Sequence, residues 1–371
     1  MSKLIHPLSE FQINHDFYPR LTLLVTIKSF DLQAIRKRYL KTRDKTSQRT
    51  GSADRREVTL GGVAAITFEK GRIINAEVLT RLKEPRGIDM KGDILALSSE
   101  NKVYLVKDRV EVIEDSWFSY IHTVDIHPHN FSRLLVSSSG FDAFFEYDMD
   151  TKEQTFEWFA WENGFDHGYD PQTGEKVFLT RWPEKAQALR GGGKPVMLIN
   201  DPANQVLPTA RRAAFINSVV YDQKSPDRII ATLFHEGAVY SIDKHSSAKE
   251  RILDDMLSPH GGARWSEHYM ATNTKGGQVV IGSNQHQNRY DFSQLKGKPR
   301  ELADFEWIQN AVNIGDVIVA IDSNRNAFVV FQPHSKQLDF IPFDANWAVQ
   351  DLIHGNLSVH QKQLLEEISE K

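Results

Sequence analysis

Six polar residues recur at the starts of successive β-type segments, and their side chains could carry acid–base or metal chemistry. All six can donate hydrogen bonds, and four of them are histidine or asparagine. Imidazole groups can move protons or bind divalent metal ions. The six residues are Arg86, His122, Asn217, His260, Asn310 and Trp347. Their chemistry depends on whether the fold brings the six segments together.

A metal centre is the first interpretation of the histidines. His122 and His260 begin two segments, and His235 lies in the segment that Asn217 begins. Three imidazoles from separate segments could hold Zn, Mn or Fe and leave positions open for water and substrate. Such an ion could lower the pKa of its bound water or polarise a carbonyl group. We therefore predict His122, His235, His260 and Asn217 as ligands of a divalent metal ion, with Glu236 as the group that moves a proton.

Arginine supplies groups that would bind an anion. Arg86 belongs to the set of segment starts, and Arg212 ends a long irregular segment. Guanidinium groups match the geometry of carboxylate, phosphate and sulfate. We expect Arg86 to orient an anionic group and to share the catalytic role with Glu236. The predicted substrate contacts are Arg86, Arg212, Asn310 and Trp347.

Two other interpretations of these residues stay open. They could form a metal-free site for acid–base chemistry or ligand binding. They could also bind ordered water and satisfy backbone groups without any further role. A serine triad is not indicated, because the sequence has no GxSxG turn. The chain has no cysteine, which excludes a thiolate nucleophile and disulfides.

Short β-type runs place these residues, and the runs come in sets of about four with turn signals between them. Most sets begin 36 to 50 residues apart, a spacing typical of four-stranded propeller blades. The gap between His122 and Asn217 is about twice as long, which predicts an insertion of roughly 50 residues at about 162–211 after the second full blade. We expect this insertion to act as a lid.

The last set, near Trp347, has one strand left before a helix-like C-terminus at about 357–371. Its partners must come from the N-terminal runs, an exchange that would close a ring and remove its exposed edges. The sequence therefore predicts an all-β fold: a six-bladed β-propeller closed by N-terminal strands, with residues 1–371 in one domain.

Charge and hydropathy limit the function. The net charge of −4 argues against general nucleic-acid binding. No apolar run reaches the ~20 residues that span a bilayer, and the first residues do not resemble a secretory signal, so a cytoplasmic protein is expected. A basic loop is predicted at about 30–57, with nine Lys/Arg against two Asp between 36 and 56. This segment is either a solvated loop or a surface for an anionic ligand or a protein partner.

The repeated polar starts in a six-blade count resemble the broad superfamily of six-bladed propellers, from Leu21 to about Asn356. That superfamily includes gluconolactonase-like proteins, NHL-like proteins and propeller lyases. Gluconolactonase-like members bind a divalent ion with Glu and Asn/Asp, whereas this chain has Arg86 in place of an acid. Propeller lyases use histidine with a metal, which suits His122 and His260 better.

Together these features predict a metal-assisted hydrolase or lyase acting on a small anionic or polar metabolite at the mouth of the propeller channel. The alternative is a non-catalytic propeller that binds a protein or ligand through the same face. The fold alone does not separate the two, because propellers host both kinds of function.

Overall fold

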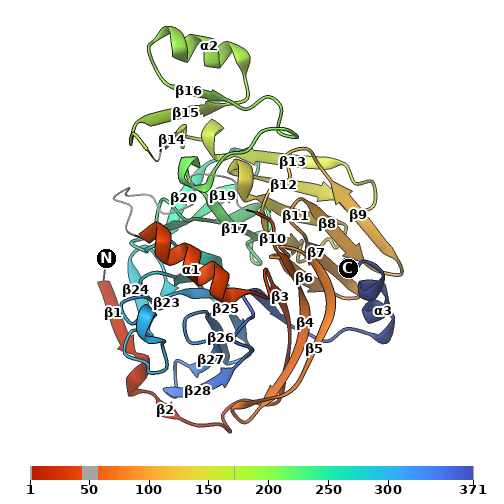
Figure 1. The fold of residues 1–371 in the computed structure, drawn as a ribbon, viewed down its shortest axis with the longest axis vertical. Coiled ribbons are helices and arrows are strands. Elements are labelled where there is room, and N and C mark those ends of the chain that lie inside the picture. The colour runs from red at the N-terminus through yellow and green to blue at the C-terminus, as the bar shows by residue number, and fades with distance from the viewer. Residues whose placement is uncertain (1, 44–56, 171, 371) are drawn as a thin grey trace.

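Six blades, each built on four antiparallel strands, form a ring in the computed structural model, which describes residues 2–43, 57–170 and 172–370 (Figure 1). The first of the four strands lies innermost in each blade, and the fourth lies furthest from it among the four. Apolar side chains fill the spaces between neighbouring sheets as several buried clusters rather than one central core. The ring therefore has a channel lined by six first strands, as expected for a propeller.

The first three blades follow the chain from the N-terminal strands onward. Blade one contains β29 (Val349–His354), β3 (Leu21–Ile27), β4 (Leu60–Glu69) and β5 (Arg72–Lys83). Blade two contains β6 (Ile88–Lys91), β7 (Ile94–Ser98), β8 (Lys102–Val106) and β9 (Val110–Glu114). Blade three contains β10 (Ile121–Ile126), β11 (Arg133–Ser138), β12 (Ala143–Asp148) and β13 (Gln154–Phe159).

The other three blades complete the ring. Blade four contains β17 (Ile216–Tyr221), β18 (Arg228–Leu233), β19 (Ala238–Asp243) and β20 (Lys249–Leu253). Blade five contains β21 (His260–Trp265), β22 (His268–Asn273), β23 (Gln278–Gly282) and β24 (His286–Asp291). Blade six contains β25 (Ile308–Ile314), β26 (Val317–Asp322), β27 (Ala327–Gln332) and β28 (Gln337–Pro342).

The predicted ring closure is confirmed. The C-terminal strand β29 pairs antiparallel with β3, so blade one combines both ends of the chain. The chain then forms α3 (Val359–Glu367), whose first turn carries a capping box between Ser358 and Gln361. Leu364 and Leu365 of α3 pack into the core between blades one and two. The C-terminal helix is confirmed as well.

The first residues of the chain add a feature that was not predicted. Strand β1 (Ser2–Pro7) pairs parallel with β24, and β2 (Gln12–Ile13) pairs parallel with β28. Blades five and six therefore each have a fifth strand on the outer edge. Between these two strands, Leu8 and Phe11 are buried in the core of blades five and six.

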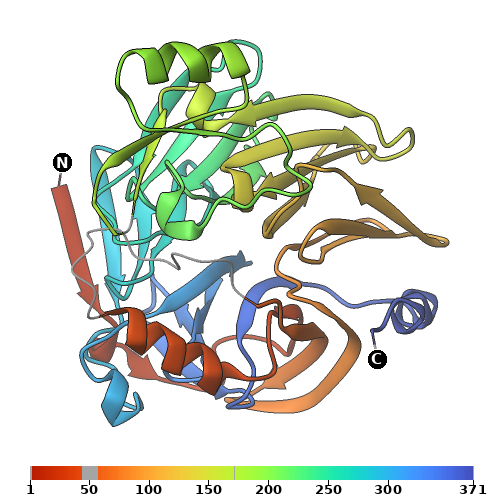
Figure 2. The same ribbon diagram turned by 45° about the horizontal axis from the view of Figure 1, so that its top comes forward.

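The insertion lies between blades three and four. Blade one combines both ends of the chain, so blade three is the second blade whose four strands are consecutive in the sequence. The insertion has secondary structure of its own. It contains a separate sheet of β14 (His167–Tyr169), β15 (Lys176–Thr180) and β16 (Val196–Leu198), with α2 (Pro183–Gly191) after β15. Figures 1 and 2 show this sheet and helix projecting from one side of the ring, so they do not lie over the channel as a lid. Leu179, Ile199 and Leu207 anchor the insertion in the core between blades two and three.

The predicted basic loop is partly helical. Residues Leu32–Arg43 form α1, which lies across the face of the ring in Figure 1. Asp31 begins this helix, and its carboxylate accepts a hydrogen bond from the backbone N–H of Ala34 at 2.8 Å. The remaining basic residues at 44–56 lie outside the described residues. Here the face of the ring that carries α1 is called the mouth.

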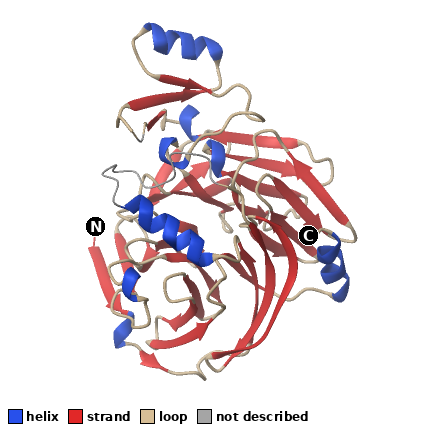
Figure 3. Ribbon diagram, viewed as in Figure 1, coloured by secondary structure: helices blue, strands red, loops and turns tan. Residues whose placement is uncertain are grey.

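Helices are few elsewhere in the described chain (Figure 3). None of those described has both the length and the apolar character required to cross a membrane.

Candidate functional site

Equivalent positions near the start of the six innermost strands form what is here called the channel ring. The six side chains are all polar and all buried, with exposures between 2% and 8%. Five of the first strands have an irregular register at or next to this position. The channel ring consists of Arg86, His122, Asn217, His260, Gln309 and Gln350.

Four of the six predicted segment starts, Arg86, His122, Asn217 and His260, therefore lie in the ring. In blade six the equivalent residue is Gln309 rather than Asn310, and in blade one it is Gln350 rather than Trp347. Each of these strands accommodates an extra residue in a bulge. The strand start that was read from the sequence is therefore wrong by one position in blade six. In blade one the predicted start lies before the strand, in the turn that leads into β29.

The chain positions four of the ring residues by the same local device. The residue two positions earlier is left-handed in each case: φ is 41° at Glu84, 49° at Tyr120, 51° at Phe215 and 58° at Ser258. Such a conformation is uncommon for a non-glycine residue, and it reverses the backbone direction sharply before the strand begins. In the two histidine blades it also aims a backbone carbonyl at the imidazole ring.

Both ring histidines are held in the same tautomer. Nδ1 of His122 lies 2.9 Å from the carbonyl oxygen of Tyr120, and Nδ1 of His260 lies 3.1 Å from that of Ser258. A carbonyl oxygen only accepts hydrogen bonds, so Nδ1 carries the proton in each ring and Nε2 keeps its lone pair in the neutral form. Thr274 lies 2.8 Å from the same Nδ1 of His260.

Burial keeps both imidazoles neutral. It is the largest cause that lowers the pKa of His122 well below its ordinary value, and the charge of Arg86 lowers it further. Burial and the charge of Lys28 lower the pKa of His260 to about 3. Two unprotonated nitrogen bases therefore stand in the channel at neutral pH.

Arginine side chains surround His122. Nη1 of Arg86 lies 3.4 Å from Nε2 of His122, and Nη2 forms a 2.7 Å ion pair with Glu84. Arg212 stacks on two aromatic rings, with its guanidinium carbon 5.4 Å from the centre of Tyr120 and 4.7 Å from that of Phe215. Its charge also acts on His122 and lowers the pKa of that histidine. The predicted anion-binding arginines thus lie on the same side of the ring as this histidine.

Asn217 supplies a further acceptor to the ring. Its side-chain amide donates to the carbonyl oxygen of Pro259 at 3.1 Å. Its Oδ1 is buried and has no hydrogen-bond partner among the described residues. A buried polar atom in this state is uncommon and is found where a ligand or water completes the bonding.

Two predicted site residues of blade four lie away from the ring. Nε2 of His235 lies 3.0 Å from the carbonyl oxygen of Thr209, and the imidazole of His235 packs against Phe215 and Phe234. Glu236 is half-buried and acts electrostatically on Arg251 of the outer strand β20. Within residues 2–43, 57–170 and 172–370, no group of three or more His, Asp or Glu side chains is arranged to hold a metal ion. The predicted ligand set therefore does not form a ready-made metal centre, and metal binding stays a prediction.

Asn310 and Trp347 have structural partners of their own. Asn310 donates from Nδ2 to the carboxylate of Asp351 at 2.6 Å, which links the first strands of blades six and one. Trp347 packs edge to face on Phe30, with ring centres 6.4 Å apart. Neither side chain is part of the channel ring.

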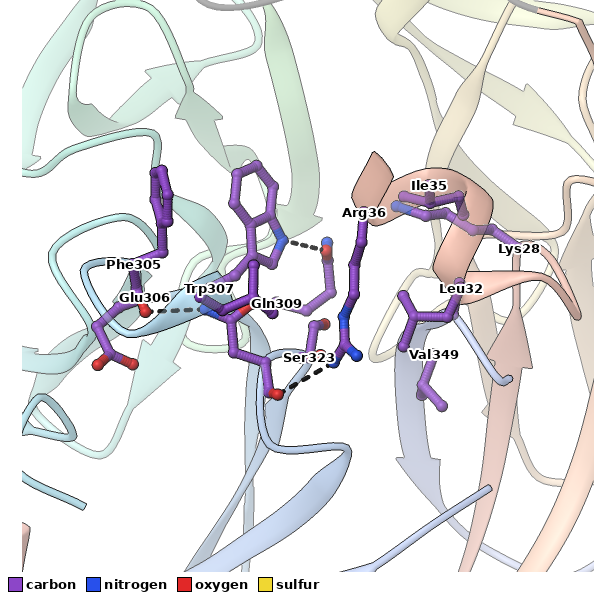
Figure 4. Close-up of a pocket in the computed structure, with 13 residues that line it drawn as sticks. Lys28, Leu32, Ile35, Arg36, Phe305, Glu306, Trp307, Gln309, Ser323 and Val349 are labelled. Atoms are coloured by element: carbon purple, nitrogen blue, oxygen red, sulfur yellow. Dashed lines mark hydrogen bonds between the residues drawn. The ribbon is translucent and has the colours of Figure 1, made fainter. Parts of the chain in front are cut away.

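A pocket opens beside the ring between α1 and blade six (Figure 4). Gln309 belongs to both the ring and the pocket, and it accepts a 2.8 Å hydrogen bond from the indole of Trp307. Trp307 in turn lies edge-on to His260, with ring centres 6.1 Å apart. The pocket thus leads from the mouth to the histidine side of the channel.

Sequence reasoning missed Gln309, Gln350, Lys28 and the pocket itself. A signal for the two glutamines was present, because Ile308-Gln309 and Val349-Gln350 repeat the pattern of Ile121-His122 and Ile216-Asn217. The pocket had no such signal, because α1 and blade six are separated by more than 250 residues in the chain.

Comparisons with known proteins identify the fold and not a family. No protein-family model matches the chain, and no curated protein matches it. A chain of a nidogen–laminin complex is similar at a TM-score of 0.53 and 7% identity, covering 89% of this chain and 97% of its own. A protein of unknown function from Bacteroides caccae is similar at a TM-score of 0.50 and 10% identity, covering 90% of this chain and 98% of its own.

A streptogramin B lyase structure aligns less closely, at a TM-score of 0.42 and 9% identity, covering 70% of this chain and 83% of its own. Similarity at these identities concerns the course of the backbone and not the residues of a site. The six closed blades show that the chain is a β-propeller, and the two structures with TM-scores of 0.53 and 0.50 share the course of its backbone.

Proposed function

We propose that the chain is an enzyme of the hydrolase or lyase type that acts on a small anionic metabolite at the mouth of the propeller channel. The observation that carries this proposal is the pair of neutral imidazoles, each with Nδ1 bound to a backbone carbonyl, beside Arg86. In the proposed reaction, Arg86 and Arg212 attract the anionic group. Nε2 of a ring histidine then accepts a proton from a substrate carbon or from water.

Substrate charge would make the histidines better bases. Burial and nearby cations lower the pKa of both His122 and His260. A bound anion adds a negative charge that favours the protonated form of imidazole, so it raises the pKa of both groups. The proposal gives no role to Glu236, whose charge acts on Arg251, and it routes no step through a metal ion.

A non-catalytic binding propeller is the second candidate function. It is favoured by the low exposure of the channel ring, because all six side chains are at most 8% exposed. A substrate would have to reach them through the pocket beside Gln309. A protein that only binds a ligand at the mouth would not need this access.

The test is a search for turnover with purified protein and a panel of small carboxylates, lactones and phosphate esters, followed by proton NMR. The His122→Asn and His260→Asn variants should lower any turnover by about 10²–10⁴-fold, the usual contribution of a general base. The matched control is His354→Asn, because His354 is exposed at the end of β29. Binding of an anion without turnover would support the second candidate, and elemental analysis of the same samples tests the predicted metal.

A further inference from the structure

The pocket at the mouth is held together by contacts that fix α1 on blade six. Nη2 of Arg36 donates to the carbonyl oxygens of Ser323 and Asn324 at 2.5 and 3.0 Å, and to Oδ1 of Asn326 at 2.7 Å. Three acceptors on one turn of blade six hold the helix at a defined distance from the blade. The cavity of about 80 Å³ between them is thus a built feature of the fold.

The walls of the pocket are mostly apolar. Figure 4 shows Leu32 and Ile35 of α1 on one side and Phe305 and Trp307 of the blade-six side opposite them. Val349 contributes from the closing strand β29. A ligand group inside this pocket would gain free energy by leaving water for apolar contacts.

The polar groups of the pocket carry a positive charge toward the channel. Lys28 and Arg36 both line it, and the charge of Lys28 acts on His260. Glu306 also lines the pocket, but it is bound by Lys298 at 2.5 Å and Arg325 at 2.9 Å. The site therefore combines an apolar chamber with two cationic side chains, while its carboxylate is bound by cations that lie outside the lining of the pocket.

We infer that the ligand is a small aliphatic anion, whose charged group lies toward Lys28 and the channel ring and whose short hydrocarbon chain fills the pocket under α1. This inference rests on the proposed function and adds the substrate class to it. Size favours a chain over an aromatic ring, because a cavity of roughly 150 Å³ is known to take up benzene and this one is smaller. The hydrocarbon chain of the ligand would have only a few carbon atoms.

The experiment measures binding of acetate, butanoate, hexanoate and decanoate by calorimetry, with hexylamine as the probe of opposite charge. Each added methylene should tighten binding about fourfold until the pocket is full, because burial of one methylene is worth about that factor. Decanoate should gain nothing over hexanoate, and hexylamine should not bind. A constant affinity along the series would overturn the inference, as would tight binding of hexylamine.

Two variants separate the contribution of the ligand's hydrocarbon chain to binding from that of its charged group. Ile35→Trp fills the pocket and should remove the dependence on chain length, whereas Leu32→Ala enlarges it and should move the optimum to longer chains. Ile74→Trp is the matched control, because Ile74 lies on the outer strand of blade one and is 39% exposed. If small anions bind without any chain-length effect, this inference fails, and the turnover assay alone decides the proposed function. If no anion binds, the proposed function fails with it.

Discussion

Nε2 of His122 lies 3.4 Å from Nη1 of Arg86, while Nη2 of the same guanidinium lies 2.7 Å from the carboxylate of Glu84. The side chains of Glu84 and Arg86 are both only 3% exposed. Arg86 therefore connects a buried negative charge to a buried neutral base. Nη1 also lies 3.4 Å from Oε1 of Gln350, so the same group links the first strands of blades one, two and three.

Removing one partner of this ion pair should destabilise the protein strongly. Glu84→Gln or Arg86→Met removes one charge of this buried ion pair and leaves the other charge in place, which costs about 3–5 kcal/mol of unfolding free energy. The double variant removes both charges and should lose less than either single variant. Urea unfolding of the three variants measures this. As the control, Glu114→Gln breaks an exposed pair with Lys102 and should change stability by at most about 1 kcal/mol.

Two glycines offer a test of how tightly the inner strands pack. A methyl group on Gly87 would meet the backbone of Thr123 and Val124 of blade three at 2.6 Å. Gly87→Ala should therefore push two first strands apart and cost about 3 kcal/mol, at the upper end of overpacking effects. Gly191→Ala is the control, because nothing lies within 4 Å of that position at the end of α2. Thermal unfolding should show a large loss for the first variant and none for the second.

The blade count and the closure could be predicted because they depend on patterns that repeat along the chain. Four apolar strands per unit and turns at regular intervals are local signals, and a single strand left at the C-terminus requires a partner from elsewhere. Strands β1 and β2 lacked such a signal. Leu4 and Ile5 remain about half exposed on the outer edge of blade five, so no alternation of buried and exposed residues marks β1.

The site could be predicted only in part. His122, Asn217 and His260 were found because polar residues of a suitable type stand at the strand starts. In blade six the bulge shifts the equivalent position by one residue, so Asn310 was predicted in place of Gln309. His235 was expected in the channel because it follows a second strand on the mouth side. Its imidazole instead contacts the carbonyl oxygen of Thr209 near the end of the insertion, a contact that depends on tertiary packing.

Asp351 should make the stability of the ring depend on pH. It lies partly buried between blades six and one, and desolvation raises its pKa to about 7 from an ordinary value of 3.8. The folded state therefore holds a proton that the unfolded state has released between about pH 4 and 7, and stability falls as pH rises through this window. This difference in pKa between the folded and unfolded states corresponds to at most about 4 kcal/mol of unfolding free energy. Relative to wild type, Asp351→Asn should thus become more stable as the pH rises from 4.5 to 8.

Urea unfolding at pH 4.5, 6 and 8 measures that difference. Oδ1 of Asp351 accepts hydrogen bonds from both Asn310 and Leu352, and the asparagine Oδ1 can accept both of them. Any constant loss from the changed bonding is separated from the pH effect because only the slope is compared. Asp304→Asn, at an exposed position, is the control. Equal slopes for Asp351→Asn and wild type would contradict the prediction.

The neutral state of the ring histidines can be observed directly by NMR of the imidazole groups. Because burial lowers the pKa of both His122 and His260, their signals should stay at neutral-imidazole values between pH 7 and 5. The double variant Glu84→Gln/Arg86→Met removes the cation beside His122 and should raise its pKa, with a smaller effect on His260, whose pKa is lowered more by Lys28 than by Arg86. The His122→Asn and His260→Asn variants assign the signals. Titration of either wild-type signal near pH 6.5 would show that the channel admits enough water to solvate an imidazolium, and the proposed bases would then be charged in part at neutral pH.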